Sequence, residues 1–115
     1  MTKPSDISDP SYRGAMEAAD LHIDAGDYLA AVRTCADAFV SLIEKRPDIL
    51  KPDRDVRPSL WPQLGVKLEV EGGSRPHLVW ERERFSMSEA ATFLEFVMDQ
   101  IVRAERTPAP ANPKP

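Results

Sequence analysis

Hydrophobic residues recur every three or four positions over residues 28–46, and charged residues fall between them. This spacing places the apolar side chains on one face of a helix. The residues that carry it are Val32, Cys35, Phe39, Leu42 and Ile43. We therefore predict an amphipathic helix from Tyr28 to about Arg46, closed by Pro47, which cannot donate a backbone hydrogen bond within a helix.

A shorter helix is predicted before it, from Pro10 to about Ala25. Asp9 can accept hydrogen bonds from the first free amides, and proline is favoured at the first helical position. The apolar face is formed by Tyr12, Ala15, Met16, Ala19 and Ile23. Gly26 is suited to the left-handed conformation that ends a helix, and Asp27 can cap the next one. Because the connection is short, the two helices should lie antiparallel as a hairpin over residues 10–46.

Five residues of this predicted hairpin resemble one unit of the tetratricopeptide repeat in the spacing that such units use for close helix packing. They are Ala19, Gly26, Tyr28, Ala31 and Ala38. The resemblance covers about a third of the chain, and no second copy follows. It implies close packing of the two helices, and we do not expect a peptide-binding repeat array.

The second half of the chain has a different pattern. Residues 48–63 form a proline-rich segment that we expect to be an ordered loop. Apolar and charged residues then alternate over 66–71, glycines follow at 72–73, and residues 77–85 can return as a second strand. Alternation with a period of two predicts strands, so we expect a two-stranded antiparallel β-hairpin.

A third helix is predicted from Ser86 to about Arg106. Ser86 and Glu89 are spaced as a capping box, in which each side chain accepts a hydrogen bond from the other's backbone amide. The apolar stripe that follows consists of Ala90, Phe93, Leu94, Val97, Met98 and Ile101. Phe96 falls outside the centre of that stripe.

Together these elements predict an α+β fold: a helical hairpin, a proline-rich loop, a β-hairpin and a C-terminal helix. The 11 prolines lie mainly at the two ends and in the central loop. We expect a disordered lead over residues 1–8, one domain over 9–106 and a disordered proline-rich tail over 107–115.

Composition adds limits on the environment of the chain. Its net charge is −4, and no apolar run approaches the ~20 residues that cross a bilayer. The first residues lack the apolar core of a secretory signal, so we expect a cytoplasmic protein that does not contact membranes. The single cysteine, Cys35, is predicted to be a buried thiol.

Candidate chemistry is sparse in the sequence. The two histidines, His22 and His77, have no acidic or histidine partner at metal-ligand spacing. No nucleophile motif or phosphate-binding glycine loop is found, and the aspartates suit caps and loops. We therefore predict a protein that is not an enzyme and needs no cofactor or metal.

Surface residues suggest binding instead. Trp80, Arg82 and Arg84 share one face of the second predicted strand, and tryptophan and arginine are enriched where interfaces carry binding energy. Trp61 and Phe96 are further candidates, and core packing or surface ion pairing are the alternatives for these residues. We predict a small interaction or accessory module that self-associates, as a homo-oligomer, or binds a partner protein.

The alternative prediction is a nucleic-acid-associated regulator. It requires the arginines of the loop and the β-hairpin to converge into one basic patch. These arginines are Arg54, Arg57, Arg75, Arg82 and Arg84. Acidic residues interspersed among them weaken such a patch.

Overall fold

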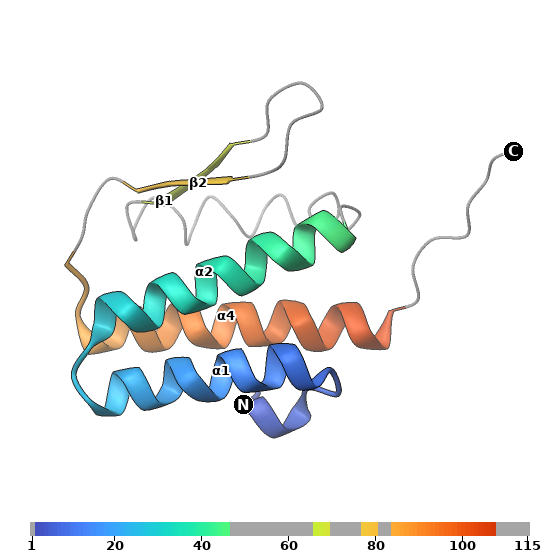
Figure 1. The fold of residues 1–115 in the computed structure, drawn as a ribbon, viewed down its shortest axis with the longest axis horizontal. Helices are drawn as coiled ribbons and strands as arrows, with labels where there is room; N and C mark the ends of the chain where they lie inside the picture. Colours follow the sequence, from blue (N-terminus) through green and yellow to red (C-terminus); the bar gives the residue numbers. More distant parts are fainter. Residues whose placement is uncertain (1, 47–65, 70–76, 81–83, 108–115) are drawn as a thin grey trace, which may run out of the picture.

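Three α-helices pack side by side in the computed structural model, which describes residues 2–46, 66–69, 77–80 and 84–107. They are α1 (Pro10–Asp24), α2 (Tyr28–Lys45) and α4 (Met87–Arg106). Figure 1 shows α2 and α4 running in the same direction and α1 running against both. The C-terminal ends of α2 and α4 therefore lie together, beside the start of α1.

The predicted helical hairpin is confirmed, including the residues that bound its helices. The Asp9 side chain accepts hydrogen bonds from backbone amides of the first turn of α1, and Pro10 is the first helical residue. Gly26 has a φ of 82°, the left-handed region in which a side chain is strained. The Asp27 side chain then accepts from the Ala30 amide at 3.2 Å, which caps α2.

The predicted capping box of the last helix is also confirmed. The Glu89 amide donates to the Ser86 hydroxyl at 3.1 Å, and the Ser86 amide donates to the Glu89 carboxylate at 2.9 Å. Two backbone donors that the helix cannot satisfy internally thus find side-chain acceptors. Helix α4 begins directly after them, at Met87.

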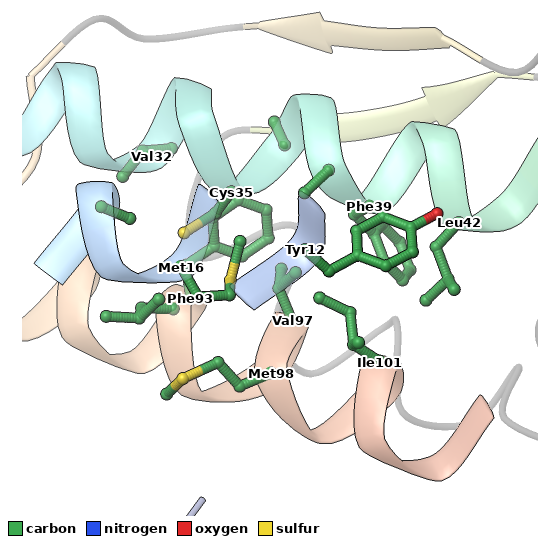
Figure 2. Packing of buried hydrophobic residues seen from close by; sticks show 14 of the residues in the cluster. Tyr12, Met16, Val32, Cys35, Phe39, Leu42, Phe93, Val97, Met98 and Ile101 are labelled. Carbon is green, nitrogen blue, oxygen red and sulfur yellow. The ribbon is translucent and has the colours of Figure 1, made fainter. Parts of the chain in front are cut away.

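The core lies where the apolar stripes of the three helices meet (Figure 2). The largest side chains that are almost fully buried on the helices are Phe39, Phe93, Met16, Ile101, Val32, Val97 and Cys35. Every residue of the predicted stripe of the last helix is buried. Cys35 is buried as predicted, and its desolvation raises the pKa of its thiol from 9.0 to about 12.

The α+β fold class expected from the sequence is wrong, because a bundle of three α-helices makes up most of the described chain and holds its core. The helices have 15, 18 and 20 residues, whereas strands β1 (Val66–Glu69) and β2 (His77–Trp80) have four each. These strands pair antiparallel outside the bundle, beside α2 (Figure 1). The apolar faces of the helices cover one another, so the bundle closes without a β-hairpin as one of its layers.

Residues 2–8, which lie within the lead predicted to be disordered, are ordered. Pro4–Asp6 form a 3-10 turn, η1, and the side chain of Ile7 is 0% exposed. Ile7 stands alone among polar neighbours, so no periodic pattern marks it in the sequence. Its burial in the core outweighs the local polarity that predicted disorder.

Hydrogen bonds fasten this N-terminal segment to α1 and α4. The Ser8 and Asp9 amides donate to the Glu105 carboxylate at 2.8 and 2.9 Å. The Arg13 guanidinium donates to the Ile7 carbonyl at 2.8 Å. Glu105 lies in the last turn of α4, where the helix dipole disfavours a negative charge, but it faces the positive N-terminal end of the antiparallel α1.

Several predicted features fall outside the described residues. They are the proline-rich loop, the turn between the two strands and the tail beyond Thr107. Within the described ranges, no helix has the length and apolar character needed to span a bilayer.

Candidate functional site

The predicted surface residues are dispersed in the structure. Trp61 and Arg82 lie outside the described residues, and Trp80 is the last residue of β2. Arg84 is exposed and precedes α4. The role of these residues in binding stays a prediction.

Phe96 lies at the edge of the core, between α4 and α2. Its ring meets Phe39 edge-on, with centroids 5.5 Å apart, and lies nearly parallel to Phe93 at 6.4 Å. Such contacts stabilise aromatic pairs beyond the area that they bury. Part of the ring remains exposed, so Phe96 packs in the core and can still contribute to a surface.

A groove of about 380 Å³ runs between α1, α4 and the N-terminal segment. We call it the α1–α4 groove. Its described lining consists of Thr2, Lys3 and Pro4 from the N-terminal segment, Asp20 from α1, and Ser88, Ala91, Thr92, Leu94, Glu95 and Met98 from α4. The residues of this groove come from segments that are far apart in the chain, so no single local pattern predicts it.

An apolar stripe on α4 leads from this groove into solvent. Met87, Ala91, Leu94 and Met98 follow one another at intervals of four, three and four residues. Leu94 and Met98 are 6% and 5% exposed, whereas Met87 is 58% exposed and Ala91 is also exposed. The stripe is therefore covered at its C-terminal half and open at its N-terminal half.

Carboxylates line both helical walls of the α1–α4 groove. Asp20 of α1 and Glu95 of α4 lie in the lining itself. Glu17 and Asp24 are three residues before and four residues after Asp20, and Asp99 is four residues after Glu95. These spacings place each on the same side of its helix as the lining residue. The five carboxylates define what we call the acidic walls.

Carboxylates within each of the acidic walls repel one another. Glu17 with Asp20, Asp20 with Asp24, and Glu95 with Asp99 are like-charge pairs one helical turn apart, each of which destabilises a helix by roughly 0.2–0.5 kcal/mol. Within the described part of the chain, no basic side chain forms an ion pair with Asp20 or Glu95. Asp99 accepts a hydrogen bond from the Thr2 hydroxyl, which leaves its negative charge in place.

Basic residues near the acidic walls lie at their ends, and Arg103 is four residues after Asp99. Arg13 lies one turn before Glu17, but its guanidinium donates to the Ile7 and Ser8 carbonyls at 2.8 and 3.2 Å. Lys3 is the one basic residue among the described residues of the lining. The sequence signals for this site are therefore the acidic pairs at helical spacing and the Met87 to Met98 stripe.

Metal ligation finds no support among the residues that the structure describes. No cluster of three histidine, cysteine or acidic side chains within these ranges could hold an ion. His22 lies half-buried on α1, and His77 is the first residue of β2.

Comparison with families of known proteins, with curated proteins and with solved structures finds no match for this chain.

Proposed function

We propose that this chain is a non-catalytic interaction module that binds a partner protein through the α1–α4 groove. The proposal rests on Asp20 and Glu95, which form no ion pair with a described residue, and on the adjoining apolar stripe, which continues into solvent. A partner that covers Met87 and Ala91 removes apolar area from water. The same partner can neutralise Asp20 and Glu95. Each of these carboxylates is repelled by an acidic neighbour on its own helix, which lowers the stability of the unbound chain.

Charge also discriminates among the kinds of partner. Two copies docked face to face at this groove would set carboxylates against carboxylates, which disfavours self-association there. Phosphate backbones would be repelled in the same way. Of the arginines in the nucleic-acid alternative, Arg84 belongs to the described residues, and the convergence of the others stays a prediction. We therefore favour a different protein over a second copy or a nucleic acid.

Site-specific photocrosslinking tests the proposal in the cytoplasm, the compartment that we propose for this protein. A photoreactive amino acid replaces Thr92, an exposed residue of the groove, and separately Asp37, an exposed residue of α2. We expect one protein to crosslink at position 92 and not at 37, and excess unmodified chain to compete it away. Equal crosslinking at both positions, or no competable adduct at 92, overturns the proposal.

Self-association through another surface is the runner-up, and sedimentation equilibrium tests it separately. We expect a monomer at micromolar concentration when no partner is present. A dimer that persists at this concentration would favour a second copy of this chain over a different protein as the partner.

A further inference from the structure

We infer that the partner segment bound by the α1–α4 groove is a cationic amphipathic helix. This inference rests on the proposed function and specifies the chemistry of the occupant. The spacing of the apolar stripe, the charge of the two walls and the position of the N-terminal segment support it.

The apolar stripe has the geometry of a seam between helices. Intervals of four, three and four residues from Met87 to Met98 keep these side chains along one line of α4, as in paired helices. Within the bundle, Leu94 and Met98 are already covered. Met87 and Ala91 continue the line without cover, so a further helix would extend the packing by its own apolar stripe.

The acidic walls determine the charge of that helix. Asp20 stands on α1 and Glu95 on α4, so carboxylates flank the groove on both sides. Lysine or arginine on either edge of the partner's apolar stripe would face one wall each. Their long aliphatic stems would also cover exposed Ala91, while the charged groups reach the carboxylates.

The N-terminal segment fixes the end at which the helix enters. Thr2, Lys3 and Pro4 line the groove, while Ile7 anchors the segment in the core. The open part of the stripe lies at the other end, at Met87. Among the described residues, the chain thus places one basic residue, Lys3, in the lining and leaves Met87 and Ala91 exposed.

Fluorescence anisotropy with designed peptides tests the inference on the full chain. The probe is a labelled 14-residue helix, ~21 Å long, with leucine on one stripe and lysine on its edges. A second peptide keeps the leucines and replaces each lysine by glutamate. We expect saturable binding of the lysine peptide that weakens with added salt, and no saturable binding of the glutamate peptide.

Matched variants locate the binding. Asp20→Asn with Glu95→Gln removes two charges from the acidic walls, whereas Asp37→Asn with Glu44→Gln removes two from α2. We expect the first pair to weaken the lysine peptide about fivefold or more, and the second pair to change it less than about twofold. Circular dichroism checks that both double variants keep their helices.

The outcomes separate the inference from the proposed function. Equal weakening by the two double variants indicates unspecific attraction to an acidic protein and overturns the inference. Failure of the lysine peptide to bind, while the crosslink at position 92 persists, also overturns it but leaves the proposed function standing. Loss of the crosslink at position 92 removes the proposed function itself.

Discussion

Replacement of Ile7 by alanine tests the finding that the N-terminal segment is part of the folded core. Ile7 is 0% exposed, although it lies outside every α-helix and among polar residues. The substitution removes three carbon atoms from a buried position. It leaves the helices and their capping residues unchanged, so packing is the quantity that changes.

The expected loss follows from the buried carbons. Each contributes about 0.8 kcal/mol of transfer free energy, so three give roughly 2.4 kcal/mol. The cavity left behind adds to this loss, which puts Ile7→Ala in the range of about 2–5 kcal/mol. Because domains of this size are stable by about 5–15 kcal/mol, the change is a large fraction of the total.

Urea unfolding followed by circular dichroism at 222 nm measures the change, because the described chain is mainly helical. Leu21→Ala is the matched control: Leu21 is also a large aliphatic residue, but it is 68% exposed on α1. We expect the control to change the free energy of unfolding by less than about 0.5 kcal/mol. A loss of under ~0.5 kcal/mol for Ile7→Ala would refute the argument that the segment is held by its buried side chain.

Four further predictions concern capping, backbone conformation, burial and charge. Ser86→Ala should lower the free energy of unfolding by about 1 kcal/mol in urea, because it removes half of the α4 capping box; an unchanged midpoint would contradict that role. Gly26→Ala should lower it by roughly 1–2 kcal/mol, because a Cβ is strained at a φ of 82°, although no described residue beyond the two chain neighbours comes within 4 Å of that Cβ; an unchanged free energy of unfolding would contradict this strain. Folding raises the pKa of the Cys35 thiol from 9.0 to about 12, so the contribution of this thiol to the free energy of unfolding is fully present below pH 9. It is lost between about pH 9 and 12, at roughly 1.4 kcal/mol per pH unit, because the unfolded chain gives up the proton first. Cys35→Ala should flatten this decline, and a decline that stays as steep would show another cause. Asp20→Asn with Glu95→Gln should raise the unfolding free energy by roughly 1 kcal/mol while it weakens binding, because three like-charge pairs are relieved; a loss of stability would mean that these carboxylates support the fold.

Local chemistry made the helix boundaries predictable. Asp9, Gly26, Asp27 and the Ser86–Glu89 pair act on amides and backbone angles within a few residues of themselves. Their effect does not depend on the rest of the fold, so the sequence shows where each helix begins or ends. The apolar periodicity between these points then identifies the faces that are buried.

Fold class and candidate site depended on contacts between distant segments. Alternating residues indicated strands, but alternation does not tell whether a sheet forms a layer of the core or lies beside it. Phe96 fell outside the centre of its stripe and was a candidate for an interface, whereas Phe39 of α2 covers part of its ring. The α1–α4 groove joins residues from both ends of the chain, which no local pattern indicates.

By itself, the sequence determined the three helices, their caps and the buried thiol, because each depends on spacing along one short segment. Only the tertiary structure decided that α2 and α4 are parallel, that Ile7 enters the core, and that Asp20 and Glu95 face one groove. These features arise from packing among segments far apart in the chain, where burial of apolar area and repulsion of like charges act through space.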